Sequence, residues 1–159
     1  MFEVVLFEPE IPPNTGNIIR LCAATGARLH LIEPLGFELD DRRLRRAGLD
    51  YHEFAAVEVH ASLGAFAARC RPPRLFAQSR FGARSLYDIR FSPGDALLFG
   101  AESRGLPPDL DARITVESRV RIPMREGIRS LNLANAVAIT LYEALRQCNA
   151  MTTDGLQLP

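Results

Sequence analysis

The segment ALLFG, Ala96–Gly100, is the part of the sequence that decides the fold. Its run of apolar residues has almost no polar alternation, which is typical of a strand buried on both faces of a parallel sheet. Similar short runs recur along the chain and are separated by stretches of helical character. The runs are Phe2–Phe7, Arg28–Ile32, Ala56–Val59, Arg74–Gln78, Ala96–Gly100 and Arg119–Pro123. This alternation predicts an α/β fold with a mostly parallel, six-stranded sheet flanked by helices.

Helices are expected between the strands. The ranges are Thr15–Thr25, Asp41–Ala47, Ser62–Cys70, a short turn at Pro108–Leu110 and a C-terminal helix from Ala134 to Gln147. Ligands of parallel sheets usually bind at the carboxyl ends of the strands. The unusual residues of this sequence follow the strand ends, so we expect the functional site there.

Composition limits the classes of protein that the chain can represent. Its 159 residues predict a single domain, residues 1–150, and a short tail, residues 151–159, that is expected to be disordered. The net charge is zero, and all nineteen basic residues are arginine, which excludes a P-loop because that motif needs a lysine. The three cysteines have neither metal-ligand spacing nor the even count of a disulfide set, so no metal is expected. Without a signal peptide or membrane-length apolar run, a cytoplasmic location is expected.

The loop after the first strand reads EPEIPPNTGNIIR, Glu8–Arg20. Asn14 or Thr15 can cap the next helix, and Gly16 permits close backbone approach. Arg20 follows one helical turn after Gly16, where it could hold a phosphate or carboxylate. The alternative is an ordinary capped helix with a solvated arginine.

The loop after the most buried strand lies within LLFGAESRGLP, Leu97–Pro107. Gly100 and Gly105 bracket a charged Glu-Ser-Arg cluster, and glycines let main-chain groups approach a flat ligand. Glu102 offers a hydrogen-bond acceptor in this loop. The alternative is a common tight turn that contains glycine.

The third segment, IPMREGIRSLNLAN, runs from a strand end, Ile122, into the C-terminal helix at Asn135. Free N–H groups and partial positive charge at a helix amino end favour a polar or anionic group. We expect Ser130 to cap the helix, which would leave Asn132 and Asn135 facing a ligand. Redundant capping is the alternative.

Together the three segments resemble the motifs of the SPOUT methyltransferases in their SpoU branch, in order and spacing. The matching residues are Asn14, Gly16 and Arg20; Gly100, Glu102, Gly105 and Leu106; and Ile122, Pro123, Met124, Ser130 and Asn132. The likeness is greatest to the short branch, a catalytic domain alone, that methylates the ribose 2′-hydroxyl of the wobble cytidine or carboxymethylaminomethyluridine, position 34, in leucine tRNAs. It implies a trefoil knot at the carboxyl end, S-adenosylmethionine as methyl donor with S-adenosylhomocysteine as product, and a homodimer.

The resemblance also implies residue roles. Arg20, Glu102, Ser130 and Asn132 match catalytic positions, with Arg20 near the reacting hydroxyl. The backbone around Gly100, Ile122 and Ser130 is implied to surround the adenosyl group, and Gln78 is added because it ends a strand. No metal takes part in this chemistry.

An RNA substrate requires local positive charge, because the whole chain is neutral. Arg43 and Arg46 lie in the arginine-rich run DDRRLRRAGLDYH, and Arg129 lies near the expected pocket, so these residues are expected to contact the anticodon stem-loop. A solvated helix face is the alternative for the run. Another RNA target such as ribosomal RNA, or a non-catalytic RNA-binding dimer, are the alternative functions.

Overall fold

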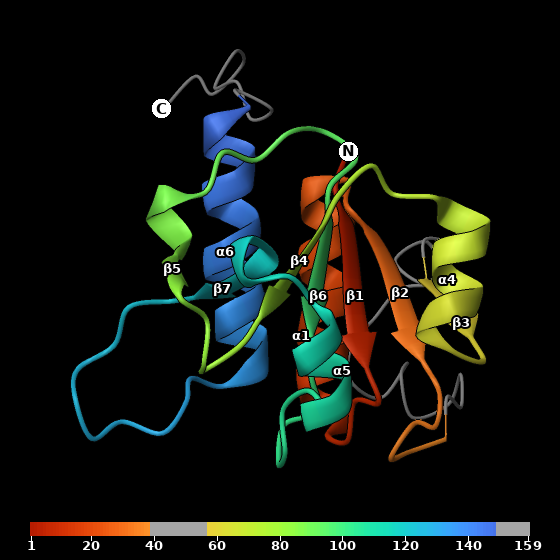
Figure 1. Cartoon of the computed structure of the whole chain (residues 1–159). Helices are drawn as coiled ribbons and strands as arrows, with labels where there is room; N and C mark the ends of the chain where they lie inside the picture. The colour runs from red at the N-terminus through yellow and green to blue at the C-terminus, as the bar shows by residue number, and fades with distance from the viewer. Residues whose placement is uncertain (39–56, 149–159) are drawn as a thin grey trace, which may run out of the picture.

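The computed structural model describes residues 1–38 and 57–148 (Figure 1). Its helices are α1 (Pro12–Thr25), α4 (Leu63–Cys70), α5 (Pro108–Arg113) and α6 (Leu133–Gln147), with single 3-10 turns at Leu86–Asp88 and Val116–Ser118. Its strands are β1 (Glu3–Phe7), β2 (Arg28–Ile32), β3 (Val57–His60), β4 (Leu75–Gln78), β5 (Arg84–Ser85), β6 (Ala96–Phe99) and β7 (Arg119–Arg121). The helix expected at Asp41–Ala47 and the tail 151–159 lie outside the described residues.

The strands form one sheet in the order β3-β2-β1-β6-β4-β7-β5, and every pairing between them is parallel. The predicted α/β fold with a parallel sheet is therefore confirmed. The expected count of six strands is wrong, because the described part of the chain forms seven. The additional strand is β5, and its two residues are too short to produce an apolar run in the sequence.

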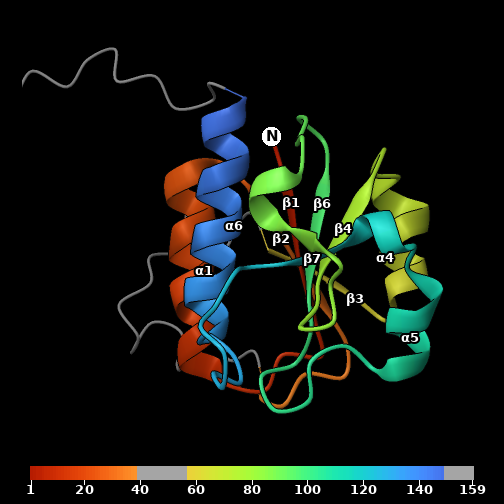
Figure 2. The same ribbon diagram turned by 60° about the vertical axis from the view of Figure 1, so that its left-hand side comes forward.

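Helices cover both faces of the sheet, with α1 and α6 on one face and α4 and α5 on the other (Figure 2). Alternate residues of β1 serve the two layers, since Val4 and Leu6 pack with α1 and α6 whereas Val5 packs with Phe66 of α4. All four residues of β6 are buried, as its uninterrupted apolar run predicts. Among the described helices, none has both the length and the apolarity needed to cross a bilayer.

The first helix begins earlier than expected, at Pro12 instead of Thr15. Proline suits the first turn of a helix because its missing N–H would have no partner there. Ile11 is the N-cap and its side chain makes no capping bond, so the expected cap by Asn14 or Thr15 is wrong. Asn14 instead lies inside the first turn, where its side chain is available for other bonds.

Candidate functional site

The three segments that the sequence singled out meet at one edge of the sheet, beyond the carboxyl ends of β1, β6 and β7. This follows from the strand order, since β1 pairs with β6, β6 with β4, and β4 with β7. In parallel strands all carboxyl ends lie at the same edge, which is where such sheets bind ligands. Hydrogen bonds between side chains of these segments fix their relative positions.

Asn14 joins all three segments. Its side chain is buried, and its Nδ2 donates to Oε1 of Glu102 at 3.0 Å. Its Oδ1 accepts a hydrogen bond of 2.9 Å from Nδ2 of Asn132. A chain of three side chains, Glu102–Asn14–Asn132, therefore runs from the loop after β6, through the first turn of α1, to the start of α6.

Glu102 is an anchor for the loop between β1 and α1. Besides the bond from Asn14, its carboxylate accepts hydrogen bonds from the backbone N–H groups of Glu10 at 2.8 Å and Ile11 at 3.2 Å. A carboxylate that accepts three N–H bonds holds its donors in place. This geometry favours a positioning role for Glu102, although the sequence placed it among the catalytic positions.

The same two loops are joined a second time in the opposite direction. The backbone N–H and the hydroxyl of Ser103 each donate to the carboxylate of Glu10 at 2.9 Å. These two bonds hold the pKa of Glu10 below its ordinary value. Arg104 forms an ion pair with Glu8 beside them. The three charged or polar residues after β6 therefore each bind the loop after β1: Glu102 through the backbone N–H groups of that loop, Ser103 through Glu10, and Arg104 through Glu8.

The structure explains why position 100 is a glycine, for a reason that the sequence did not reveal. The loop after β6 folds back so closely that a Cβ on Gly100 would lie 2.2 Å from the carbonyl carbon of Gly105. The return is fixed by a 2.8 Å hydrogen bond from the N–H of Gly105 to the oxygen of Ala101, and by the left-handed φ of +71° at Gly105. The nearest neighbour of Gly100 is thus its own loop, whereas the sequence suggested a ligand.

The residues expected to surround a cofactor lie on neighbouring strand ends. Gln78 ends β4, Gly100 follows β6, and Ile122 follows β7 and is buried. Gln78 is in register with both Phe99 of β6 and Val120 of β7. The structure therefore brings these three positions together, whereas Ser130 lies farther along the exposed segment 123–132.

The chain after β4 crosses tightly over β7. The N–H of Ser79 donates to the oxygen of Val120 at 2.9 Å, and a Cβ on Gly82 would lie 2.6 Å from the carbonyl carbon of Val120. After this crossing, β5 pairs with the edge of β7 opposite to β4. β7 is thus held between two strands whose connecting segment passes over its carboxyl end.

Asn132, and not Ser130, caps α6. Its Oδ1 accepts from the N–H groups of Ala134 at 2.9 Å and Asn135 at 3.4 Å, as expected of an N-cap residue. The expectation that Ser130 caps this helix is wrong, because the helix begins at Leu133 and Ser130 lies outside it. Asn135 is exposed in the first turn. Asn132 therefore has two roles: its side-chain oxygen caps the helix, and its side-chain nitrogen donates to Asn14.

Two arginines for which roles were predicted, Arg20 and Arg129, lie on the surface of the protein. Arg20 lies in the middle of α1 with an exposed side chain, and Arg129 is exposed on the segment between β7 and α6. Arg43 and Arg46 lie outside the described residues. Asn14 matches a motif residue, but only a capping role was expected of it, so its bonds to Glu102 and Asn132 were not predicted. An amide side chain directly after Pro12-Pro13 was the available signal.

Comparison with known proteins gives consistent matches. Residues 1–142 match the model of the SpoU rRNA Methylase family. A protein from Polaromonas sp. (strain JS666 / ATCC BAA-500) named tRNA (cytidine(34)-2′-O)-methyltransferase is 61% identical over 149 residues, which cover 92% of this chain and 91% of that protein.

Solved structures agree with this match. One, described as "Structural insights into the 2-OH methylation of C/U34 on tRNA", is 49% identical, with a TM-score of 0.84 and coverage of 92% of this chain and 95% of that chain. Another, the SpoU methyltransferase AviRb from Streptomyces viridochromogenes in complex with AdoMet, is 28% identical, with a TM-score of 0.77 and coverage of 91% of this chain and 57% of that chain.

Proposed function

The chain belongs to the SpoU rRNA methylase family, and we propose that it transfers a methyl group from S-adenosylmethionine to the ribose 2′-hydroxyl of nucleotide 34 in tRNA. The observation that carries this proposal is the Glu102–Asn14–Asn132 chain, because it joins the three motif segments at the carboxyl edge of the sheet. The name of the relative at 61% identity supports the same reaction. Leucine tRNAs are the proposed substrates, through the anticodon stem-loop. A tRNA substrate also implies a cytoplasmic location.

The strand ends fit the adenosyl part of the cofactor. Gln78 is in register with the ends of β6 and β7, which precede Gly100 and Ile122. Main-chain groups of these three residues are proposed to form hydrogen bonds with the base of the nucleoside. Apolar side chains on the segment after β7, Met124 at 40% and Ile128 at 57% exposure, are available to cover it. Bound there, S-adenosylmethionine would supply an electrophilic methyl group. Ser130 is proposed to complete this site.

The protein's own task is to prepare the ribose hydroxyl, which is a poor nucleophile while protonated. Arginine stays charged at neutral pH, so Arg20 is not proposed as the base. We assign to Arg20 the orientation of the hydroxyl and the stabilisation of negative charge that develops on its oxygen. Asn132 and Ser130 are proposed to shape the pocket, and Glu102 to position the loop before α1.

The trefoil knot of this family is also proposed for residues near the carboxyl end. The crossing of residues 79–82 over β7 supports it, because β7 lies between β4 and β5. Such a fold departs from the general rule that chains do not thread their own loops. We propose that residues 1–150 fold as one domain that contains the knot.

A homodimer is proposed because apolar side chains remain exposed beside the site. Ile11 before α1 is 43% exposed and Tyr142 on α6 is 46% exposed, and the two helices lie side by side (Figure 2). A partner subunit that covers α1 and α6 would bury them. Two subunits could then share one tRNA, with Arg43, Arg46 and Arg129 proposed to contact its phosphates.

A methyl-transfer assay tests the proposed function. Labelled S-adenosylmethionine is incubated with the protein and bulk tRNA from a strain that lacks the activity, and nuclease mapping locates the label. Label on the 2′-oxygen of nucleotide 34 in leucine tRNAs is the expected result. Label on ribosomal RNA alone would overturn the substrate, and cofactor binding without label on any RNA would overturn the enzyme assignment.

A further inference from the structure

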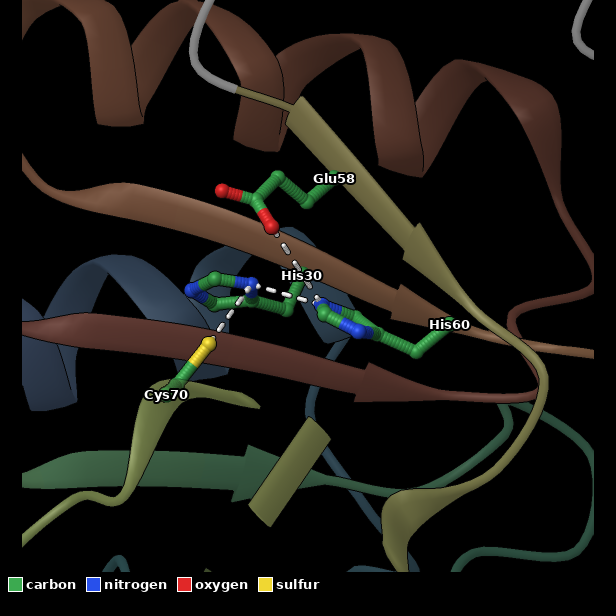
Figure 3. A group of neighbouring side chains, drawn as sticks. All are labelled: His30, Glu58, His60 and Cys70. Carbon is green, nitrogen blue, oxygen red and sulfur yellow. Dashed lines mark hydrogen bonds and ion pairs between the residues drawn. The ribbon is translucent and has the colours of Figure 1, made fainter. Parts of the chain in front are cut away.

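Four side chains with metal-binding atoms converge on the face of the sheet opposite to α1 and α6 (Figure 3). They are His30 of β2, Glu58 and His60 of β3, and Cys70 at the end of α4. One ligand atom from each lies within 4.8 Å of all the others. Strand register explains the meeting, since His30 pairs with Glu58, and His60 pairs with Ile32, two residues farther along β2.

The two imidazoles form the centre of this cluster. Nδ1 of His30 lies 3.0 Å from Nε2 of His60, and both residues are buried, at 1% and 6% exposure. Phe66 of α4 packs against them with ring centroids 4.8 Å and 5.6 Å away. Packing against Phe66 therefore holds the two histidines in place. An apolar environment of this kind favours a fixed metal-ligand geometry.

Glu3 orients His30. Its Oε2 lies 2.8 Å from Nε2 of His30, so the carboxylate holds the ring proton on Nε2 and leaves the lone pair of Nδ1 directed toward His60 and Cys70. Arg28 in turn pairs with Glu3 and keeps the carboxylate in place. A carboxylate behind a histidine is the usual outer support of a metal-binding imidazole, because it fixes the tautomer and raises ligand basicity.

Cys70 and Glu58 complete a set of four donors. Sγ of Cys70 lies 4.0 Å from Nδ1 of His30, and Oε2 of Glu58 lies 4.0 Å from Nε2 of His60. Tetrahedral zinc, with Zn–N of about 2.05 Å and Zn–S of about 2.3 Å, requires roughly 3.3–3.6 Å between ligand atoms. Small shifts of the side chains would bring the four donor atoms to these separations. Glu58 also accepts from Nε of Arg69 at 2.8 Å through the same oxygen, so it must turn to bind.

We propose that His30, His60, Cys70 and Glu58 bind a Zn²⁺ ion that fastens the edge strand β3 and the end of α4 to β2. A thiolate together with two imidazoles excludes Mg²⁺ and Ca²⁺, which prefer oxygen ligands. Four protein donors leave no open position, so the site is structural and takes no part in methyl transfer. From the sequence no metal was expected, because only the spacing of the cysteines was weighed, whereas these donors come from three separate elements.

Zinc content and cobalt substitution test the site. The full-length chain without a histidine tag is stripped with a chelator, dialysed, and titrated with Zn²⁺ and separately with Co²⁺. We expect about one tightly bound Zn²⁺ per chain, a thiolate-to-cobalt charge-transfer band, and a rise in thermal midpoint on Zn²⁺ binding. Absence of both binding and the band would overturn the proposal and leave a hydrogen-bonded histidine pair.

Matched variants separate this site from adventitious binding. Cys70→Ser should weaken Zn²⁺ binding at least tenfold and abolish the charge-transfer band, whereas Cys148→Ser, which alters another half-buried cysteine at a helix end, should keep both. Glu3→Gln should weaken binding about 10- to 100-fold while the band remains, because Glu3 supports the ligand and does not touch the metal. Equal binding by the Cys70→Ser variant, or loss of the band in Cys148→Ser, would overturn the assignment.

Discussion

The side-chain amide of Asn132 donates a 2.9 Å hydrogen bond to that of Asn14, although 118 positions of sequence separate the two residues. Asn14 passes the connection on to Glu102, and Asn132 also caps α6. The start of the last helix is therefore fixed to the first turn of the first helix and to the loop after the central strand.

The dual role of Asn132 can be divided by substitution. Asn132→Ser keeps a capping oxygen but cannot reach Asn14, so we expect a loss of about 1 kcal/mol in the free energy of unfolding, from the unpaired amide oxygen of Asn14, and a marked loss of methyl transfer. Asn132→Ala also loses the cap and should cost about 1 kcal/mol more in the free energy of unfolding. Urea denaturation and the transfer assay measure the two effects. Full activity in the serine variant would show that the bond to Asn14 is dispensable.

Glu102→Gln tests the positioning role of the carboxylate. One oxygen becomes an NH₂ group that faces N–H donors, so at least one of the bonds to Glu10, Ile11 or Asn14 is lost. We expect a destabilisation of about 1–2 kcal/mol and slower transfer at every pH. A changed pH profile with unchanged stability would instead indicate that Glu102 exchanges a proton during the reaction.

Arg20→Ala tests the proposed stabilisation of charge on the ribose oxygen. Cofactor affinity and oligomeric state should be unchanged, while the rate of transfer should fall by about 10²–10³-fold, as when a donor to an oxyanion is removed. Isothermal titration and single-turnover kinetics measure these quantities. Arg20→Lys keeps the charge but loses the planar fork and should recover only part of the rate. A normal rate in the alanine variant contradicts the role.

The proposed RNA contacts are tested by the salt dependence of tRNA binding. Replacing Arg43 and Arg46 together with Ala should weaken binding and reduce the slope of log K against log salt by about 1 for each lost phosphate contact. Cofactor affinity should not change. Arg113→Ala, on α5 at the face of the sheet opposite to α1 and α6, serves as the control. An unaltered slope in the double variant would remove this arginine run from the interface.

Gly100 should not tolerate a side chain, because an added Cβ would lie 2.2 Å from the backbone at Gly105. We expect Gly100→Ala to cost at least about 2 kcal/mol in the free energy of unfolding and to lower cofactor affinity. Gly64→Ala is a matched control, since the nearest atom would be 3.7 Å away in the first turn of α4. Its stability should be unchanged or slightly higher. Equal stability of both variants would contradict the tight-loop explanation.

Strong local signals in the sequence predicted much of this fold. The apolar run at Ala96–Phe99 indicated the fully buried central strand, and the alternation of strands and helices indicated the parallel sheet, both of which the structure confirms. The strand β5 and the start of α1 escaped prediction. Two residues are too few to show a pattern, and prolines can begin a helix as well as stiffen a loop.

The sequence by itself determined which three segments match the family motifs, because motif residues and their spacing are properties of the chain. Only the tertiary structure decided what those residues do to one another. Glu102 became an anchor, and Asn132 replaced Ser130 as the cap of α6, because hydrogen-bond partners 88 and 118 positions away are set by strand order. The meeting of His30, His60 and Cys70 has the same cause, since parallel register and helix packing, and not sequence spacing, bring their ligand atoms together.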